Sequence, residues 1–290
     1  MLETLIHKEK FYELCDRYGI DHPATVVYHK GMGHAFELPF DGPFVVKPAE
    51  SDTYWKHPFP TQKKAYILQT RAEVDAVIDQ IYGAGYEDAL ILQDFIPGDD
   101  SFMRVVTNYS GADGKVRLMC VGHVLLEEHT GHAIGNHAVI ITEPNQELMK
   151  RVRNLLEDLH YVGFSNFDIK YDRRDGKYKF FEINTRQGRS NYYVTGSGFN
   201  IAKYIVEEYV YGKELKFETA KEEHLWMVVP KAVAFKYVKD PESKAKMKKL
   251  IKAGKMVNPV FKKGDLGWPR LYRMLRTHFS HFIKFRKYYS

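Results

Sequence analysis

Apolar residues recur every three or four positions in several stretches of the chain, and this spacing predicts helices. The predicted helices cover residues 8–18, 71–82, 145–159, 201–211 and 270–289. The second begins at a capping box, in which Thr70 and Glu73 satisfy free backbone amides of the first turn, and Gly83 ends it. Gly19 and Gly212 end the first and the fourth.

Shorter apolar runs between turn residues predict strands. These strands cover residues 25–28, 44–48, 89–96, 102–108, 115–126, 165–172 and 177–184. Strands and helices do not alternate strictly, and several consecutive strands are close enough in sequence to form hairpins. The pattern therefore favours an α+β fold with antiparallel sheets over a doubly wound parallel sheet.

The composition is that of a globular protein. Of 290 residues, 44% are hydrophobic and 14% are aromatic, which excludes a wholly disordered chain. The sequence has no apolar run of bilayer length, and its first ten residues lack the apolar segment of a secretory signal. Cys15 and Cys120 are far apart, so we expect two reduced thiols in a cytoplasmic protein.

Charge is distributed unevenly along the chain. Residues 213–290 contain 20 Lys and Arg against 7 Asp and Glu, although the whole chain has a net charge of only +6. A basic C-terminal extension on an acidic body indicates an anionic partner for the extension. That partner would be a membrane surface, a nucleic acid or a phosphorylated substrate. Because the extension has no finger or helix-turn-helix signature, nucleic acid is not expected.

The predicted helix 270–289 combines basic residues with an apolar stripe. The stripe consists of Leu271, Met274, Leu275, Phe279, Phe282 and Ile283. One interpretation is that the stripe packs on the body of the protein. The other is that the helix lies on an anionic lipid surface, which would place the protein peripherally at the inner face of the membrane.

A hairpin predicted for residues 165–184 carries the sharpest set of candidate site residues. Asp175-Gly176 marks its turn, and a three-residue loop with the glycine in the left-handed region is a common solution. In that register Asp168 lies opposite Glu182. Since opposed residues share a face of the sheet, as do residues two apart on one strand, Asp168, Glu182 and Asn184 would point the same way.

Two facing carboxylates in an otherwise apolar hairpin repel each other unless a cation lies between them. Carboxylate and amide oxygens are ligands that suit Mg²⁺, which completes its shell with water and phosphate. The spacing therefore predicts a magnesium site formed by Asp168, Glu182 and Asn184. The alternative is a solvated hairpin face with scattered acidic residues.

Cationic residues accompany this hairpin. Arg186 and Arg189 lie in the polar turn that follows it, where guanidinium groups can hold an acyl phosphate or a substrate carboxylate. Lys47 ends an apolar strand, where a charged side chain is costly unless it has a partner, and Lys8 begins the first helix. Taken singly, the arginines also fit an ordinary polar loop and the lysine a capped sheet edge.

As a set, these residues resemble the ATP-grasp ligases, specifically the carboxylate–amine ligase branch. The resemblance spans about residues 8–212 and is carried by Lys8, 44–48, 92–98, 166–168 and 181–186. Within that branch, residues 98–104 and 122–130 are similar to the D-aspartate ligases, which extend the stem peptide of bacterial cell-wall precursors. The resemblance implies the ATP-grasp fold, with two α+β lobes that grip ATP between antiparallel sheets.

The resemblance also implies roles for individual residues. Lys8 and Lys47 would contact ATP phosphates, and Asp100 would bind the ribose. The hinge between the lobes would line the adenine, largely through backbone groups, with Gln93, Asp94 and Phe95. Asp168 and Glu182 would hold Mg²⁺, with Asn184 on a second ion. Arg186 would steady an acyl phosphate, and Lys47 and Arg189 would join it in catalysis.

The implied reaction has two steps. A substrate carboxylate attacks the γ-phosphate of ATP, and an amine then displaces phosphate to form an amide. Two other functions stay open at this point: an ATP-grasp ligase for another amino acid or dipeptide, and a nucleotide-binding module without turnover that recruits an anionic partner through its basic tail.

Two departures from the family pattern stand out. Where family members have a glycine-rich phosphate lid, residues 51–60 carry aromatic residues and prolines, with Lys63 and Lys64 just beyond. Family members also have about a hundred residues before the first helix, so the chain is expected to be a fragment of a ligase. The expected organisation is a small lobe over 1–95, a large lobe with the metal site over 96–212, and the basic extension over 213–290.

Four histidines, His123, His129, His132 and His137, lie close together in the sequence. They admit three interpretations: a zinc site, a mobile active-site loop with a substrate-binding histidine, and an ordinary polar loop. No cysteine or ligand pair shows zinc-finger spacing, so the zinc interpretation is the weakest.

Overall fold

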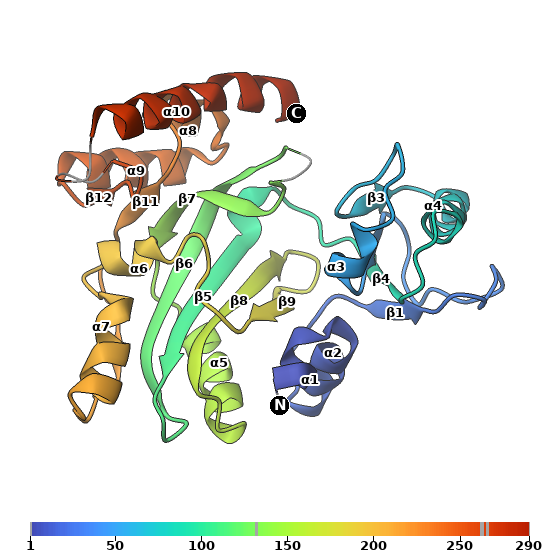
Figure 1. Cartoon of the computed structure of the whole chain (residues 1–290), viewed down its shortest axis with the longest axis horizontal. Coiled ribbons are helices and arrows are strands. Elements are labelled where there is room, and N and C mark those ends of the chain that lie inside the picture. Colours follow the sequence, from blue (N-terminus) through green and yellow to red (C-terminus); the bar gives the residue numbers. More distant parts are fainter. Residues whose placement is uncertain (1, 131–132, 262–263, 265–266, 290) are drawn as a thin grey trace. The chain divides into compact units, whose positions relative to one another are not determined.

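The computed structural model describes residues 2–289, with the exception of 131–132, 262–263 and 265–266. The chain divides into two compact units (Figure 1): Met1–Pro97 with Tyr171–Ile183, and Gly98–Lys170 with Asn184–Ser290. This division differs from the three segments expected from the sequence. Residues 213–290 belong to the second unit because β11 (Leu225–Met227) is a strand of that unit's sheet, paired with β7 (Asn136–Thr142).

The first unit contains a four-stranded antiparallel sheet in the order β1-β4-β2-β3. Its strands are β1 (Thr25–Tyr28), β2 (Phe44–Pro48), β3 (Tyr66–Leu68) and β4 (Leu90–Asp94). The predictions for 25–28 and 44–48 are confirmed. In the central strand, Gln93 lies opposite Thr25 on one side and Val45 on the other, so β4 is fixed from both edges.

The helices of the first unit are α1 (Leu2–Ile6), α2 (Lys8–Arg17), α3 (Ser51–Tyr54) and α4 (Arg71–Gly83). The capping box of Thr70 and Glu73 at the start of α4 is confirmed. Val74, Ile78 and Ile81 of α4 are fully buried in the core. Tyr54, at the end of α3, is buried in the same core, and its hydroxyl lies 2.8 Å from that of Tyr66. Packing therefore accounts for an aromatic residue in the segment where family members have a glycine-rich phosphate lid.

The larger sheet has the strand order β12-β11-β7-β6-β5-β8-β9, and β10 pairs with β6. The remaining bounds are β5 (Met103–Ser110), β6 (Val116–Glu128), β8 (Gly163–Asp172), β9 (Lys177–Asn184), β10 (Glu218–Thr219) and β12 (Met256–Val257). The pairings β5–β6, β6–β7, β5–β8 and β7–β11 are antiparallel, while β10–β6 and β11–β12 are parallel. The α+β class with mainly antiparallel pairing is confirmed.

Helices α5 (Gln146–Asp158), α6 (Tyr192–Gly196), α7 (Ile201–Ile205), α8 (Lys231–Tyr237), α9 (Pro241–Lys252) and α10 (Trp268–Tyr288) complete the second unit, together with the 3-10 turn η1 (Asp100–Phe102). The predicted helix 201–211 is divided, because α7 continues into a π-helical segment, η2 (Val206–Val210). Helices α8, α9 and α10 lie together at one end of the unit (Figure 1). Across the described residues, no helix has the length and apolarity needed to cross a membrane.

Candidate active site

The strand ends that border the turn, Asp172 of β8 and Lys177 of β9, are those predicted, but the loop between them is closed across four residues instead of the expected three. The amide of Gly176 donates to the carbonyl oxygen of Asp172 at 2.9 Å, and Gly176 has the expected left-handed φ of 73°. The side chain of Asp172 is the physical reason for the longer loop: it accepts the backbone N–H of Arg174 at 2.9 Å and so starts the turn early. The bounds of the two strands do not determine which residues face each other, and a register change of one residue would reverse the faces. The pairing of Asp168 with Glu182 therefore stays a prediction.

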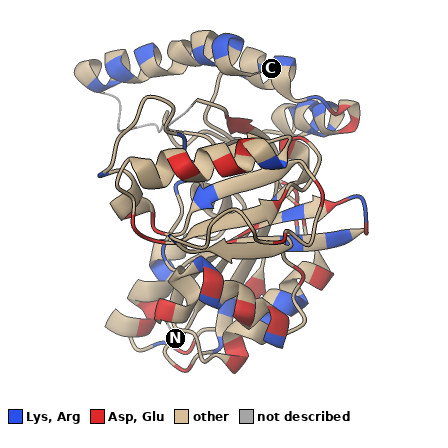
Figure 2. Ribbon diagram, turned by 90° about the vertical axis from the view of Figure 1, so that its right-hand side faces the viewer, with Lys and Arg blue, Asp and Glu red and all other residues tan. Residues whose placement is uncertain are grey.

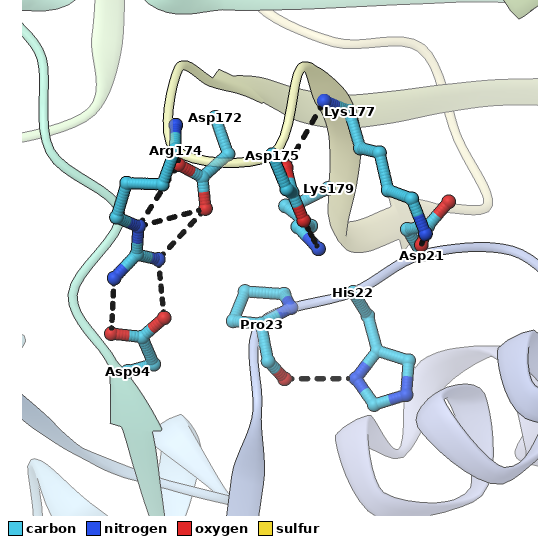
Figure 3. A network of polar contacts seen from close by, with 9 residues as sticks. All are labelled: Asp21, His22, Pro23, Asp94, Asp172, Arg174, Asp175, Lys177 and Lys179. Atoms are coloured by element: carbon cyan, nitrogen blue, oxygen red, sulfur yellow. Dashed lines mark hydrogen bonds and ion pairs between the residues drawn. The ribbon is translucent and has the colours of Figure 1, made fainter. Parts of the chain in front are cut away.

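Arg174 joins this turn to the end of the hinge strand β4. Its guanidinium donates to Asp172 from Nη2 at 2.7 Å and from Nε at 3.0 Å. The same group donates to Asp94 from Nη1 at 3.0 Å and also from Nη2. Figure 3 shows the guanidinium between the two carboxylates. Burial by itself would raise the pKa of Asp172, but the hydrogen bonds from Arg174 outweigh it and lower that pKa.

The first unit gathers several of the predicted phosphate-binding residues. Lys47 lies near the end of β2, with its Nζ 6.0 Å from the ring centroid of Phe181. Burial lowers the pKa of Lys47 to about 7, and the positive charges of Lys8 and Lys64 act in the same direction. The negative charge of Glu182 opposes them. Lys8, Lys47, Lys64 and Glu182 thus lie close enough to interact, as a site for an anion and its counter-ion requires.

The hinge residues are held by internal hydrogen bonds. Gln93 is buried, and its side-chain amide donates to the hydroxyl of Thr25 at 2.8 Å. The backbone amide of Asp94 donates to the carbonyl of Ala24 at 2.9 Å, and that of Phe95 to Pro43 at 3.1 Å. These amides already have partners, so an adenine contact at these residues would use carbonyl oxygens.

The second unit brings together Asp168, Asn184 and His137. The side-chain amide of Asn184 donates to Asp168 at 3.2 Å, so the two predicted metal ligands are neighbours. Nε2 of His137 lies 4.0 Å from the carboxylate of Asp168, and its Nδ1 lies 3.3 Å from the hydroxyl of Ser190. Burial lowers the pKa of His137 to about 4, with the charge of Arg189 acting in the same direction, so this imidazole is neutral at pH 7.

Buried polar groups fix the turn that carries the two arginines. Asn166 donates from its side chain to the carbonyl oxygen of Arg186, and its own amide oxygen accepts the hydroxyl of Thr107 at 2.7 Å. A Cβ at Gly188 would lie 2.9 Å from the side-chain oxygen of Asn191, so a larger residue at this position would require the Asn191 side chain to shift. Arg186 itself is exposed, with one guanidinium N–H donating to the carbonyl of Gln187 at 3.2 Å.

Arg189 borders a cavity of about 420 Å³. Its Nη2 donates to Glu128 at 2.8 Å, and the Glu128 side chain is 5% exposed. The charged and histidine side chains that line the cavity are Glu128, Arg189, Arg270, His278, His281 and Lys284. Burial lowers the pKa of both histidines, so at neutral pH the three basic side chains outnumber the single carboxylate. A lining with excess positive charge suits an anion.

The carboxylate of Asp100, predicted to bind a ribose, has several partners within the second unit. It accepts the backbone amide of Glu127 at 2.8 Å and lies 3.0 Å from Nε2 of His129. The hydrogen bond to Asp100 raises the pKa of His129. The ring of His129 packs at 4.4 Å from that of Tyr289, so this cluster fixes the end of the chain beyond α10. Ribose binding by Asp100 stays a prediction.

In the structure, the described histidines of this segment form hydrogen bonds and ion pairs with neighbouring polar groups. His123 binds Glu143 at 2.9 Å and the carbonyl of Ser101 at 2.7 Å. His132 lies outside the described residues. Among the residues that are described, no group of three or more His, Cys, Asp or Glu side chains is placed to hold a metal, which gives the zinc interpretation no support. The predicted magnesium site, with two carboxylates and an amide, is not a group of this kind.

The sequence did not predict that His137 contacts Asp168 or that Glu128 contacts Arg189. His137 lies in β7, a strand not predicted although the apolar run 138–141 was an available signal, and Glu128 is the last residue of β6, two residues beyond the predicted strand 115–126. Neither the contact of His137 with Asp168 nor that of Glu128 with Arg189 has a signature in sequence spacing. Both come from strands and loops that only the fold brings together.

The chain is similar to known proteins in sequence and in fold. The chain is 42% identical over 298 residues to a D-aspartate ligase of Enterococcus faecium (strain Aus0004), an alignment that covers 100% of this chain and 71% of that protein. No family model matches the chain.

Two solved structures share the fold. One is the biotin carboxylase domain of the Hydrogenobacter thermophilus 2-oxoglutarate carboxylase, in complex with MgADP and bicarbonate (TM-score 0.58, 14% identity, 75% of this chain and 48% of that one). The other is an L-amino acid ligase from Bacillus licheniformis (TM-score 0.50, 17% identity, 71% of this chain and 48% of that one). The chain therefore spans about half the length of these two solved proteins.

Proposed function

The chain belongs to the D-aspartate ligase family of ATP-grasp carboxylate–amine ligases, and from this premise we propose that it joins D-aspartate, through an acyl phosphate, to an amine of a cell-wall peptide precursor. The observation that carries the proposal is the cluster of Lys8, Lys47 and Lys64 beside Glu182 in the first unit. A group of cations with one carboxylate suits the phosphates of ATP together with a divalent ion.

The chemistry requires charge neutralisation and alignment more than covalent help from the protein. An oxygen of the amino-acid carboxylate attacks the γ-phosphorus, the bond to ADP breaks, and ADP leaves. The amine nitrogen then attacks the acyl carbon, phosphate leaves, and the nitrogen loses a proton to give the amide. Lys8 and Lys47 are proposed to hold the transferred phosphate, and Arg186 to neutralise the acyl phosphate.

Asp168, Glu182 and Asn184 are proposed to hold the magnesium that accompanies ATP. The donor set fits, because Asp168 and Asn184 are neighbours and offer oxygen atoms, and Glu182 lies two residues before Asn184 on the same strand. When bound, Mg²⁺ supplies charge neutralisation at the phosphate oxygens. The neutral His137 beside Asp168 adds no competing positive charge there.

Arg189 and the cavity beside it are proposed to select an acidic amino acid. An amino acid such as aspartate carries a carboxylate that does not react, and the basic lining of the cavity can hold it. Arg189 presents a guanidinium whose one described partner is the carboxylate of Glu128. This arrangement suits a dianionic amino acid better than D-alanine or asparagine.

Trapping with hydroxylamine tests the proposal. The chain with Mg·ATP and hydroxylamine should form an aspartyl hydroxamate with D-aspartate, and much less product with L-aspartate or D-alanine. Arg189→Gln should raise KM for D-aspartate about tenfold or more, because a charged hydrogen bond is lost, while KM for ATP stays the same. Another preferred amino acid would indicate a different ATP-grasp ligase. Tight Mg·ATP binding without any hydroxamate would indicate a nucleotide-binding module without turnover.

Nucleotide binding is expected to take up a proton near pH 7. With the pKa of Lys47 lowered to about 7, roughly half of these side chains are neutral at that pH. Bound phosphates favour the ammonium form, so binding draws a proton from the buffer, and affinity falls as pH rises above 7. Calorimetry in buffers of different ionisation enthalpy measures this uptake.

Lys47→Arg is the matched control, since arginine stays charged throughout this range. It should bind nucleotide without proton uptake. Equal uptake by the wild type and by Lys47→Arg would show that another group titrates.

A further inference from the structure

Helix α10 has one face that anchors it and another that is uncovered. Met274, His281 and Phe285 are buried, and the ring of Phe285 packs 5.4 Å from that of Tyr237 on α8. Packing on the body, the first interpretation of this helix, is therefore confirmed for part of the apolar stripe. Leu275, Phe279, Phe282 and Ile283 of that stripe nevertheless remain exposed.

The exposed apolar residues form a continuous stripe, which we call the outer face of α10. It consists of Trp268, Tyr272, Leu275, Phe279, Phe282 and Ile283. Their spacing of three and four residues places them along one side of the helix. Trp268 is 84% exposed and Ile283 is 72% exposed, values far from those of a packed surface. Isolated exposed apolar residues are ordinary, but a stripe of six over about four turns is not.

Basic residues flank the outer face. Helix α10 contains no acidic residue (Figure 2), and four of its basic residues, Arg273, Arg276, Arg286 and Lys287, are not among those that line the cavity beside Arg189. Within the described part of the chain, no carboxylate forms an ion pair with Arg273, Arg276 or Lys287. Their charge is therefore not balanced by the body of the second unit.

A groove between α8 and α10 continues the outer face. It has a volume of about 750 Å³ and an apolar floor that includes Val233 and Ile283. Lys236, Arg286 and Lys287 line the same groove. A ligand that carries phosphate groups next to hydrocarbon chains would match this combination, since the phosphates can bind the cations and the hydrocarbon can contact the apolar floor.

We propose that the outer face of α10, with its adjoining groove, binds the surface of an anionic lipid bilayer. A stripe of Trp, Tyr, Phe and Ile beside cations such as Arg273, Arg276 and Lys287 is typical of helices that lie in the membrane interface. A second copy of the chain is disfavoured as the occupant, because it would bring the basic residues of one α10 against those of the other. This inference stands apart from the ligase proposal and would hold for a protein without turnover.

Co-sedimentation of the full chain with lipid vesicles tests the proposal. Binding is expected to vesicles that contain phosphatidylglycerol, to weaken as salt is raised, and to be at least tenfold weaker with phosphatidylcholine alone. Phe279→Ser/Ile283→Ser should reduce the partition coefficient roughly tenfold or more, since two exposed apolar side chains no longer enter the interface. Arg273→Gln/Arg276→Gln/Lys287→Gln should reduce it roughly 100-fold.

Tyr209→Ser/Val210→Ser is the matched control, because these residues are equally exposed on η2 of the same unit. It should bind vesicles like the wild type. Since all the changed side chains are at the surface, each variant should keep the wild-type thermal unfolding curve, which excludes loss of folding as the cause.

Three results would overturn the proposal. The first is equal vesicle binding by the wild type and the Phe279→Ser/Ile283→Ser variant. The second is equal binding to neutral and anionic vesicles. The third is a dimer in light scattering that disappears in this variant while vesicles bind neither protein, since a second copy would then cover the outer face.

Discussion

Glu182→Gln is expected to lower formation of aspartyl hydroxamate at least about 100-fold. The amide removes a negative charge proposed to hold Mg²⁺. It also removes the carboxylate that opposes the fall in the pKa of Lys47, so a larger share of Lys47 becomes neutral at pH 7. Both effects weaken the hold on the phosphates. Rates at saturating ATP with a titration of Mg²⁺ provide the measurement.

The two contributions can be separated. Raising Mg²⁺ should restore part of the rate if metal affinity is reduced, whereas lowering the pH toward 6 should restore the part that comes from Lys47. Glu87→Gln, which changes an exposed carboxylate paired with Lys30 in the same unit, is the control and should retain full activity. A Glu182→Gln variant that forms aspartyl hydroxamate within threefold of the wild-type rate would contradict the proposed site.

Arg174→Met is expected to destabilise the protein by about 3 kcal/mol, the lower end of the range for a broken buried ion pair. The lower end applies because the Arg174 side chain is 47% exposed and so is partly screened by solvent, although that of Asp172 is only 2% exposed. Methionine keeps most of the volume but leaves two carboxylates without their cation. Urea unfolding of the full chain measures the loss.

The pH dependence of this loss has a definite sign. In the wild type the pKa of Asp172 is lowered, so the stabilisation is present above the unfolded-state pKa and is lost as pH falls through the folded-state pKa. Without Arg174, burial remains and raises that pKa, so the deficit of the variant should shrink as the pH falls.

Asp172→Asn/Arg174→Met is the matched double variant. It should recover much of the lost stability, because no buried charge is left at position 172. A double variant that is no more stable than Arg174→Met would show that the cost lies in lost packing at the turn, and not in an unpaired carboxylate.

The local elements of the fold were predictable because their signals are local. Helix α4 follows from the capping box of Thr70 and Glu73, and α5 from the spacing of its apolar residues. The strands β2 and β9 were predicted with their observed bounds. The hairpin turn was predicted one residue too short, because the side chain of Asp172 competes for a backbone amide in a way that turn statistics do not contain.

The candidate site was predictable only as a set of residue types in order. Asp168 and Glu182 were identified from their spacing, and Lys47 from the family resemblance; that family is the one to which the chain belongs. The lowered pKa of Lys47 could not be read from the sequence. It depends on burial and on Lys8, Lys64 and Glu182, whose distances in sequence carry no information about their separation in space.

The sequence by itself thus determined the α+β class, most helices and strands, the ligase family and the candidate phosphate and metal residues. The class and the elements follow from periodicity and turn chemistry, whereas the family and the candidate phosphate residues follow from the resemblance that the short motifs carry. The tertiary structure alone decided that Arg174 links Asp94 to Asp172, that His137 lies beside Asp168, and that α10 is buried on one face and open on the other. Burial and charge coupling decide such features, and both arise only when segments distant in sequence pack together.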